Sequence, residues 1–394
     1  MRILWIAPYS PYPPAGGGRQ RLYHLLRGCL AAGHEVRLLC VESEAASIPD
    51  PPPNGLTLHL HQTRSRLGIA AKGRALLSPL PEIAWAIGTP GVREELGRLR
   101  PGDYDVAILE HAHAGSLARH LAAAGIPTVL EAQNVEWTVL REAGRLDRKF
   151  RRRARYAIDA VKLRRMETAL VKSVDGTVAV SDEDARAFRE MGPRGPVVVV
   201  PNGVDLEAIG WADHTRPGGA RLLMTGDLGY VPNVDAALWA VEAVLPLAQG
   251  RVPGAVLTLA GRAPAPELAA LAGVPDVEIV ADPADMSPRF AAADVFLVPL
   301  RLGGGTRIKV LEALAAGLPV VGTPEALRGL DLEARGLALV GRTPQELVTA
   351  VERALGDDEF RRRCSREGRA FVEAHHDWRQ VAALFELALR GFVA

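Results

Sequence analysis

The residues with the clearest capacity for chemistry lie in one glycine-rich stretch, DVFLVPLRLGGGTRIKVLEALAAGLPVVGT, which runs from Asp294 to Thr323. Consecutive glycines let a backbone turn sharply and approach a ligand closely. The groups that could bind an anion there are glycine N–H groups, a hydroxyl and two cations: Gly303, Gly304, Gly305, Thr306, Arg307 and Lys309. Glu312 lies one helical turn beyond Lys309, where it could hydrogen-bond a ribose. This set predicts a site for a ribose-linked diphosphate, and the alternative is a turn with solvated charges on a surface helix.

The same stretch predicts the elements that position these groups. Val295 to Leu300 is an apolar run without alternation, which suits a strand covered on both faces. Ile308, Leu311 and Leu314 have the spacing of a buried helical stripe. The glycine loop therefore joins the carboxyl end of a strand to a helix, where backbone N–H groups and the helix dipole favour an anion.

A second glycine loop lies near the start of the chain. A strand at Ile3 to Ala7, a proline-rich turn, a helix after the glycines and a strand at Val36 to Val41 make a βαβ unit. Gly17 and Gly18 could present N–H groups to an anion, but the GGG sequence lacks the spacing of the dinucleotide fingerprint. The alternative is a helix entry that needs glycine at a tight turn.

Polar residues follow two further predicted strands, Val106 to Leu109 and Thr128 to Glu131. The first strand leads into Glu-His-Ala-His at 110–113, and the second is followed by Gln-Asn-Val-Glu at 133–136. Ligands are expected at the carboxyl ends of parallel strands. A metal site is disfavoured because His111 and His113 have no third ligand at suitable spacing. His111 is a candidate hydrogen-bonding catalytic group, and a buried, satisfied histidine is the alternative.

Composition bounds the class of protein. The chain has 394 residues, 48% hydrophobic and 24% charged, which suits a globular protein of two or three domains. Its net charge of +1 gives no global field for nucleic acid. Cys29, Cys40 and Cys364 are too few and too scattered for a disulfide framework or a zinc site. No apolar run reaches the ~18 residues of a membrane span, and no signal peptide is evident, so we expect a cytoplasmic location.

One segment, Arg141 to Lys172, is a strongly basic helical region. It could form a patch for an anionic membrane surface or an acidic acceptor, and the alternative is a solvated helical face. Aromatic residues interleaved for base stacking are missing, which argues against nucleic acid.

The chain as a whole predicts an α/β protein of two doubly wound, Rossmann-like domains whose carboxyl edges face each other across a cleft. The second half repeats the strand–helix rhythm, and 207–220, with Pro-Gly-Gly at 217–219, indicates a hinge. We expect an N-terminal domain at 1–205 and a C-terminal domain at 206–376. A final amphipathic helix, 377–394, is expected to cross back to the N-terminal domain.

Five segments together resemble one family. They are PYPPAGGGRQRLYHLL, QNVEW, VPNGVD, TGDLGYVPN and PLRLGGGTRIKVLEALAAGLPVVGT, and the last is the most specific. Over essentially its full length the chain resembles a GT-B fold glycosyltransferase of glycosyltransferase family four (glycosyl transferases group 1), in a subgroup with a GGGTR-x-K loop.

The resemblance implies an enzyme of the EC 2.4 class that transfers a sugar with retention from a nucleotide sugar, a UDP- or GDP-sugar, without a required metal or cofactor. The acceptor would be a glycan, a lipid-linked or a small molecule. Arg307 and Lys309 match the cations that stabilise the leaving diphosphate, which is electrostatic catalysis. Glu312 matches the glutamate that binds the ribose, and His111 lies near a histidine that contacts the transferred sugar. Other expected contacts are Gly17, Gly18 and Gly226 on the donor side and Arg19, Asn134 and Glu136 on the acceptor side.

The chain departs from the family pattern at two places. The first glutamate of the E-x7-E motif is replaced by Gly305, which puts donor-sugar specificity in doubt more than catalysis. The common HNVE sequence reads QNVE here, and the register among Glu110, His111 and His113 stays open. Competing functions are a nucleotide-sugar epimerase or phosphorylase on the same fold, and a non-catalytic nucleotide-sugar-binding protein. A Rossmann dehydrogenase is least favoured because G-x-G-x-x-G is absent after the first strand.

Overall fold

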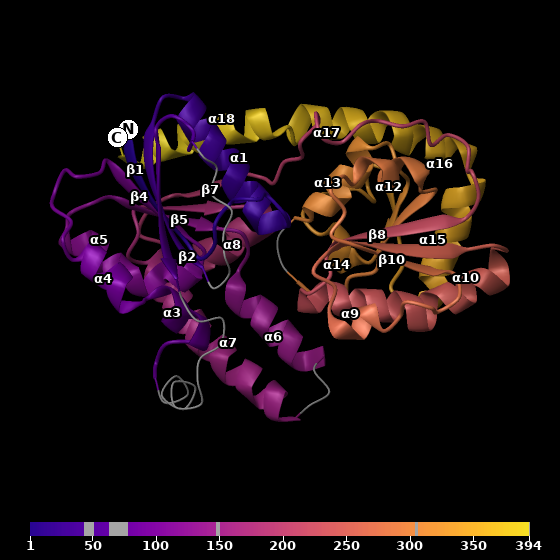
Figure 1. The fold of residues 1–394 in the computed structure, drawn as a ribbon, viewed down its shortest axis with the longest axis horizontal. Coiled ribbons are helices and arrows are strands. Elements are labelled where there is room, and N and C mark those ends of the chain that lie inside the picture. The colour runs from indigo at the N-terminus through magenta and orange to yellow at the C-terminus, as the bar shows by residue number, and fades with distance from the viewer. Residues whose placement is uncertain (43–50, 63–77, 147–149, 304–305, 394) are drawn as a thin grey trace. The chain divides into compact units, whose positions relative to one another are not determined.

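The computed structural model describes residues 1–42, 51–62, 78–146, 150–303 and 306–393, with backbone only at 83 and 86. The chain divides into two compact units, Met1–Pro201 with Val381–Ala394, and Asn202–Gln380. Each unit is built on its own parallel sheet with helices on both faces (Figure 1). The predicted class, two Rossmann-like α/β domains, is confirmed.

The first unit contains a seven-stranded sheet in the order β3-β2-β1-β4-β5-β6-β7. All its strand pairs are parallel. Its described elements are β1 (Arg2–Ala7), α1 (Gly17–Ala31), β2 (Glu35–Glu42), β3 (Leu56–Gln62), α3 (Glu82–Ile87), α4 (Pro90–Leu96), β4 (Val106–Glu110), η1 (Ala112–Leu117), α5 (Ala118–Ala123), β5 (Thr128–Ala132), α6 (Glu136–Leu146), α7 (Phe150–Val171), β6 (Gly176–Ala179), α8 (Asp182–Glu190) and β7 (Val197–Val199).

The central strands of this sheet are the ones the apolar runs predict. In β1, β4 and β5 nearly every residue is buried, because helices cover both faces of a parallel sheet. The edge strand β3 was not predicted: its sequence LTLHLHQ alternates with histidines and is only partly buried. The sequence over 65–100 predicts helices. α3 and α4 lie in that range, and 63–77 lies outside the described residues.

The second unit contains a six-stranded parallel sheet in the order β10-β9-β8-β11-β12-β13. Its described elements are β8 (Arg221–Asp227), α9 (Val231–Trp239), η2 (Ala240–Val244), α10 (Leu245–Arg251), β9 (Val256–Arg262), α11 (Pro266–Ala269), β10 (Val277–Ala281), α12 (Ser287–Ala292), β11 (Val295–Val298), α13 (Ile308–Ala315), β12 (Val320–Gly322), α14 (Pro324–Leu327), β13 (Ala338–Val340), α15 (Pro344–Gly356), α16 (Asp358–Arg363), η3 (Cys364–Gly368) and α17 (Arg369–His375).

The glycine-rich stretch folds as predicted around its loop. β11 is fully buried, and the stripe residues Ile308, Leu311 and Leu314 of α13 all belong to the buried core. The short edge strand β13 was not predicted, since three residues give too little pattern to separate a strand from a loop.

One apolar run is longer than the sequence analysis expected. Val231–Arg251, which comprises α9, η2 and α10, is long and apolar enough to cross a membrane by length and composition, and half of its most apolar part is buried in the protein. Ala236, Ala240 and Val244 from this run belong to the hydrophobic core of the second unit. We therefore interpret the run as a core helix of that unit.

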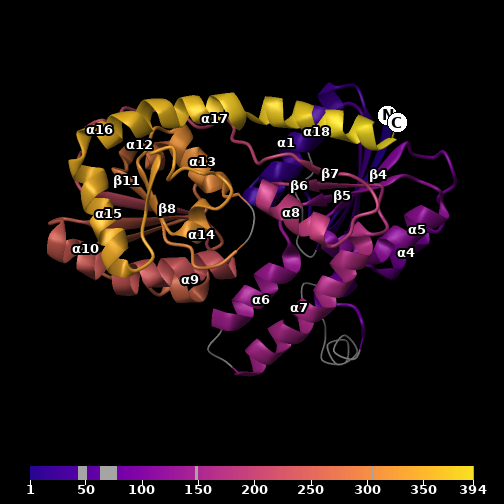
Figure 2. The ribbon, with the colours of Figure 1, turned by 180° about the vertical axis from the view of Figure 1, so that it is seen from behind.

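The last helix, α18 (Trp378–Val393), returns to the first unit, as expected. It lies beside α1 in both views of the ribbon (Figure 1, Figure 2). The ring of Phe385 stacks on Trp5 of β1 with centroids 5.5 Å apart. A Cβ on Gly28 of α1 would lie 2.4 Å from the Cβ of Ala382, so the two helices touch where the glycine has no side chain.

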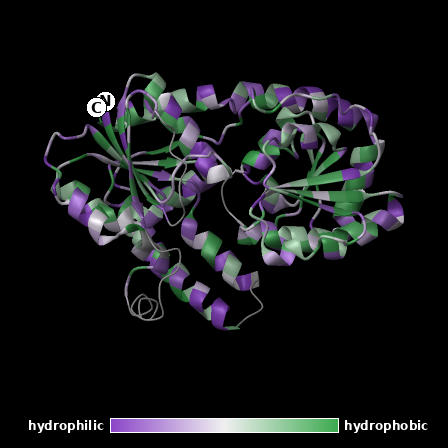
Figure 3. Ribbon diagram, in the orientation of Figure 1, coloured by the Kyte–Doolittle hydropathy of each residue, from purple (hydrophilic) through white to green (hydrophobic). Residues whose placement is uncertain are grey.

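The basic segment divides into the end of α6 and the whole of α7, which pack side by side as a helical hairpin (Figure 2). The amino-terminal end of α7, which lies away from the sheet, is strongly hydrophilic, whereas the strands of the sheet are hydrophobic (Figure 3). Arg141 and Arg164 lie over the ring of Trp137, at 4.6 and 4.9 Å from its centroid. Arg151 and Arg153 are exposed to solvent.

Candidate active site

His111 lies at the carboxyl edge of the first sheet, directly after β4. Its Nε2 lies 2.7 Å from the hydroxyl of Tyr9, and its Nδ1 lies 2.7 Å from Oε1 of Glu136. These partners follow β1 and β5, the two neighbours of β4 in the sheet, so three strand ends meet at one imidazole. The backbone of His111 has a φ of 63° and a ψ of 153°, a conformation that non-glycine residues rarely adopt. Such strain concentrates at functional sites.

The carboxylate of Glu136 joins His111 to His113. Its Oε2 lies 3.4 Å from Nε2 of His113, and the two imidazoles are stacked with centroids 5.4 Å apart. Burial acts to raise the pKa of Glu136, but the charge of His113 and the hydrogen bond from His111 outweigh it and hold that pKa well below its usual range. Asn134 donates to the same carboxylate at 3.1 Å. Glu136, expected on the acceptor side, is therefore engaged by the protein itself.

The expectation that His111 and His113 have no third metal ligand nearby is wrong, because Glu136 lies beside both. Their ligand atoms lie within 4.8 Å of one another, a set that could hold a metal ion. Spacing along the sequence misses this cluster because Glu136 belongs to a different strand end. However, both nitrogens of His111 already have hydrogen-bond partners in Tyr9 and Glu136. Metal independence stays a prediction.

A largely buried network adjoins His111. Trp5 and Gln133 donate to the two carboxyl oxygens of Glu110, at 2.9 and 2.6 Å. Burial, and then the charge of Glu131, raise the pKa of Glu110 well above its usual value. Glu131 in turn pairs with the buried guanidinium of Arg21, Nε to Oε1 at 2.6 Å. Glu110 was one of three candidates for the catalytic position, with His111 and His113. Its carboxyl is buried and hydrogen-bonded within the protein, so we do not assign it that position.

The first glycine loop packs tightly against this cluster. A Cβ on Gly18 would lie 2.5 Å from the Tyr9 hydroxyl and 2.9 Å from Oε1 of Gln133, so the close packing itself requires glycine. Gly17 is the first residue of α1. Arg19, expected on the acceptor side, pairs with Glu42 at the end of β2 and lies over the Tyr9 ring at 5.3 Å. Its side chain therefore holds this loop against the sheet.

In the second unit, the predicted donor groups gather at the carboxyl ends of the neighbouring strands β8 and β11. Nζ of Lys309 donates to Oδ1 of Asn233 at 2.7 Å, and Asn233 donates to the backbone oxygen of Asp227 at 2.7 Å. A Cβ on Gly226, which has a φ of 148°, would lie 2.5 Å from that Nζ. Burial and the charge of Arg307 lower the pKa of Lys309 to about 7.

The rest of the loop surrounds Arg307, which occupies the N-cap position of α13 without a capping hydrogen bond from its side chain. Its Nη2 lies 3.5 Å from the carbonyl oxygen of Leu302, and a Cβ on Gly303 would lie 2.7 Å from the same nitrogen. Thr306 is buried, and Nδ2 of Asn202 contacts both its carbonyl oxygen and its hydroxyl at 3.0 Å. The Thr306 hydroxyl thus fastens the loop to the start of the unit.

The remaining predicted donor residues stand as follows. Glu312 lies partly buried on α13, and its charge acts to raise the pKa of Lys309. Gly304 and Gly305 lie outside the described residues, so their roles stay predictions. An E-x7-E spacing counted back from Glu312 ends on Gly304 rather than Gly305, and both positions are glycine.

Four site residues escaped the sequence analysis: Tyr9, Gln133, Asn202 and Asn233. Asn202 and Asn233 lie in segments that carry the family resemblance, VPNGVD and TGDLGYVPN, so position within those segments was an available signal. Tyr9 lies in a proline-rich turn, and nothing in its local pattern indicates a contact with His111.

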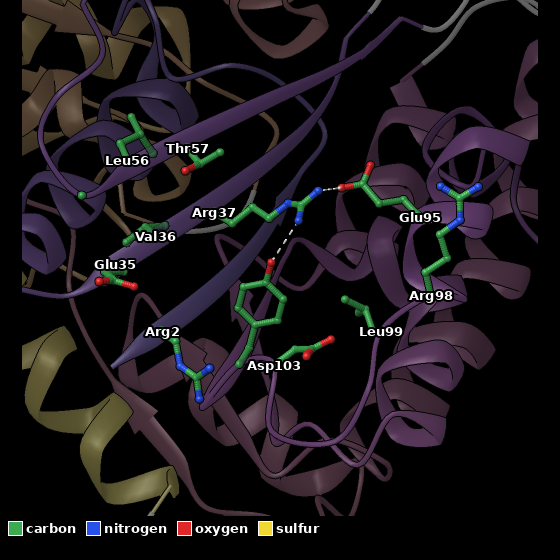
Figure 4. A pocket seen from close by; sticks show the side chains of 12 residues that line it. Arg2, Glu35, Val36, Arg37, Leu56, Thr57, Glu95, Arg98, Leu99 and Asp103 are labelled. Carbon is green, nitrogen blue, oxygen red and sulfur yellow. Dashed lines mark hydrogen bonds and ion pairs between the residues drawn. The ribbon is translucent and has the colours of Figure 1, made fainter.

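A surface pocket of the first unit lies elsewhere. It has a volume of about 740 Å³ and is lined by residues at the start of β1, β2 and β3, among them Arg2, Glu35 and Leu56 (Figure 4). Arg37 points into it and is held by Glu95 and by the Tyr104 hydroxyl (Figure 4). Because it opens at the amino ends of the strands, we do not include it in the candidate site.

Comparison with known families supports the class that this arrangement defines. The family model "Glycosyl transferase 4-like domain" matches residues 16–203, and "Glycosyl transferases group 1" matches residues 219–357. The chain belongs to this glycosyltransferase family, and its fold is that of the GT-B glycosyltransferases. It is a transferase of the EC 2.4 class, as the sequence analysis predicted.

Individual relatives agree with this assignment. The chain is 26% identical to a phosphatidyl-myo-inositol mannosyltransferase of Mycobacterium tuberculosis, over 97% of this chain and 95% of that protein. It is 31% identical to a GDP-mannose-dependent alpha-(1-6)-phosphatidylinositol monomannoside mannosyltransferase of the same species, over 55% and 63% of the two chains. Among solved structures, the sucrose-phosphate synthase of Thermosynechococcus elongatus superposes with a TM-score of 0.75 at 16% identity, covering 99% of both chains.

Proposed function

We propose that the protein transfers a sugar, with retention of anomeric configuration and without a required metal, from a UDP- or GDP-sugar to a glycan, lipid-linked or small-molecule acceptor. The observation that carries this proposal is the environment of Lys309. Its ammonium group donates to Asn233 at the carboxyl end of β8 and lies against the backbone of Gly226, which has no side chain. Only a group without a side chain leaves room there for the cation and for a ligand beside it.

The electrostatics of this cluster favour an anionic ligand. Arg307 is close enough to Lys309 that its charge lowers the pKa of the lysine. Two cations that destabilise each other gain most from a group that carries two negative charges, such as a diphosphate. Glu312, one turn along α13, is assigned to the ribose by family resemblance.

The reaction we propose needs charge stabilisation more than a nucleophile. As the bond between the anomeric carbon and the diphosphate oxygen breaks, negative charge grows on the leaving diphosphate, and Arg307 and Lys309 stabilise it. The acceptor hydroxyl attacks from the same face and passes its proton to the departing phosphate. No protein carboxylate is assigned as a nucleophile. In this scheme His111 hydrogen-bonds the transferred sugar.

Turnover with a panel of nucleotide sugars tests the proposal. Each sugar is incubated with the protein, EDTA and a set of acceptors, and both nucleoside diphosphate release and the anomeric configuration of the product are measured. We expect one class of donor to be used, the donor's configuration to be kept, and Arg307→Ala to lower kcat/KM by ~10²-fold or more. Inversion, dependence on a metal, or an Arg307→Ala effect of only a few-fold would contradict it.

The same assay separates the competing functions. A change of the sugar in the absence of acceptor would indicate an epimerase. Tight nucleotide binding without turnover over all acceptors would indicate a non-catalytic binding protein. Two of the relatives are named for transfer to phosphatidylinositol derivatives. We therefore place a lipid-linked acceptor first among those to test, at the cytoplasmic face of a membrane.

A further inference from the structure

The proton on His111 can be located from the hydrogen bonds around it. Gln133 places its amide nitrogen 3.3 Å from the carbonyl oxygen of Gly18, which can only accept. That contact fixes the amide orientation. The same nitrogen also lies 3.0 Å from the Tyr9 oxygen and 2.6 Å from Oε1 of Glu110, which makes three acceptors for its two hydrogens. An amide nitrogen donates and does not accept, so the Tyr9 hydrogen is not used on Gln133. The Tyr9 hydrogen is then available to donate to Nε2 of His111, 2.7 Å away.

The opposite side of the ring gives the complementary result. The partner of Nδ1 is the carboxylate of Glu136, which accepts and does not donate when ionised. A hydrogen bond of 2.7 Å to a carboxylate therefore requires a hydrogen on Nδ1. A neutral imidazole has one N–H and one lone pair, so a proton on Nδ1 leaves the lone pair on Nε2.

We propose that Glu136 is a positioning residue that holds the proton of His111 on Nδ1, so that the lone pair of Nε2 accepts from Tyr9 in the free protein and from a sugar hydroxyl in its place when the substrate binds. The site would thus recognise a hydroxyl that donates to His111. This part rests on the proposed function, whereas the tautomer is a property of the protein without substrate.

The surroundings of Glu136 explain why its carboxylate is held in place. Its backbone N–H donates to Oε1 of Glu167 on α7, at 3.0 Å. Burial, and then the charge of Glu136, raise the pKa of Glu167 to about 8, so Glu136 is the ionised member of this pair at neutral pH. The titratable groups around the ring, from every element packed against it, are Tyr9, Glu110, His113, Glu131, Glu136 and Glu167.

The tautomer can be measured directly by NMR in the full chain. Protein with 15N-labelled histidine is examined at pH 8 without ligand by long-range proton–nitrogen correlation, with His111 assigned through His111→Gln. We expect a hydrogen on Nδ1 and a bare Nε2 in the wild type. Glu136→Gln should shift the proton toward Nε2, because a glutamine amide can donate to Nδ1. Glu190→Gln, on an exposed face of α8, is the matched control and should leave His111 unchanged.

Kinetics complete the test. We expect Glu136→Gln to lower kcat by about 10²-fold or more while the Kd for the nucleoside diphosphate changes less than twofold. Glu136→Asp should recover part of the loss. A wild-type His111 with its hydrogen on Nε2, or a tautomer unchanged in Glu136→Gln, would overturn the inference even if Glu136→Gln were unstable, since the first result needs no variant. Absence of turnover in the wild type would instead count against the proposed function and leave the tautomer assignment standing.

Discussion

At the scale of single residues, Lys309 makes nucleotide binding dependent on pH. Its pKa in the free protein is about 7, and a bound diphosphate raises it because the anion favours the charged form. Affinity should therefore be full below pH 7 and fall as pH rises above it, by up to ~10-fold per pH unit, with proton uptake on binding. Calorimetry of nucleoside diphosphate binding at pH 6, 7, 8 and 9 measures this. Lys309→Arg is the control, and should remove the dependence above pH 7 because arginine stays charged.

The two buried glutamates beside His111 should lose unequal amounts of stability on the same substitution. Glu131→Gln leaves the buried guanidinium of Arg21 without its counter-charge, so we expect a loss of about 3–5 kcal/mol of unfolding free energy. The raised pKa of Glu110 means that its environment disfavours the charged form, so Glu110→Gln, which puts a neutral amide there, should cost only about 1 kcal/mol for an altered hydrogen bond. Urea denaturation at pH 7 compares them. Equal losses would contradict the raised pKa of Glu110.

The raised pKa of Glu110 also fixes the sign of a pH effect. The folded protein keeps the proton to higher pH than the unfolded chain, so the contribution of Glu110 to stability is full below pH ~4.3 and is lost as pH rises toward its folded pKa. In Glu110→Gln that decline is absent. The stability gap between the wild type and Glu110→Gln should therefore shrink from pH 5 to pH 8.

At the scale of elements, α18 is predicted to hold the first unit together. Phe385 is fully buried and stacks on Trp5, whereas Leu387, two residues further along the same helix, is 65% exposed. We expect Phe385→Ala to cost about 3–5 kcal/mol through the lost burial and the cavity left behind. Leu387→Ala is the matched control and should stay within about 0.5 kcal/mol of the wild type. Similar losses in both variants, in urea denaturation, would show that α18 is not anchored as described.

The helix α7 carries the proposal of membrane contact. If its exposed arginines bind an anionic surface, replacing Arg151, Arg152 and Arg153 by glutamine should weaken co-sedimentation with anionic vesicles by ~100-fold, at about 1 kcal/mol per charge. The same triple replacement at Arg342, Arg353 and Arg362, which are exposed on the second unit, controls for net charge. Binding unaffected by the first set would remove α7 from the account.

Some elements could be predicted from the sequence and others could not. Buried strands such as β1 and β11 were predictable because covered parallel strands leave continuous apolar runs. The edge strands β3 and β13 were not, because partial burial or short length erases that signal. The Lys309 cluster was predictable from local spacing, but its partner Asn233 was not placed there. The contacts of Tyr9 and Glu136 with His111 join different strand ends, and spacing along the chain carries no information on them.

At the scale of the whole molecule, the central claim is that the second unit binds a nucleotide diphosphate through the glycine loop and α13. A chain of two Rossmann-like units has many turns with glycine, and the family assignment covers both units. What distinguishes this loop is the combination of Lys309, Arg307 and Glu312 on a single helix start. The claim therefore requires that nucleotide binding depends on these three side chains.

The most direct test is thermal stabilisation by a panel of nucleotides and nucleotide sugars in EDTA, for the wild type, Glu312→Ala and Glu333→Ala. A ligand at a hundredfold excess over Kd should stabilise the protein by ~2.7 kcal/mol. We predict stabilisation of the wild type by one nucleotide class, strongly reduced in Glu312→Ala and retained in Glu333→Ala, whose side chain is exposed elsewhere on the second unit. No stabilisation by any nucleotide, or an equal effect in Glu312→Ala, would contradict the donor site.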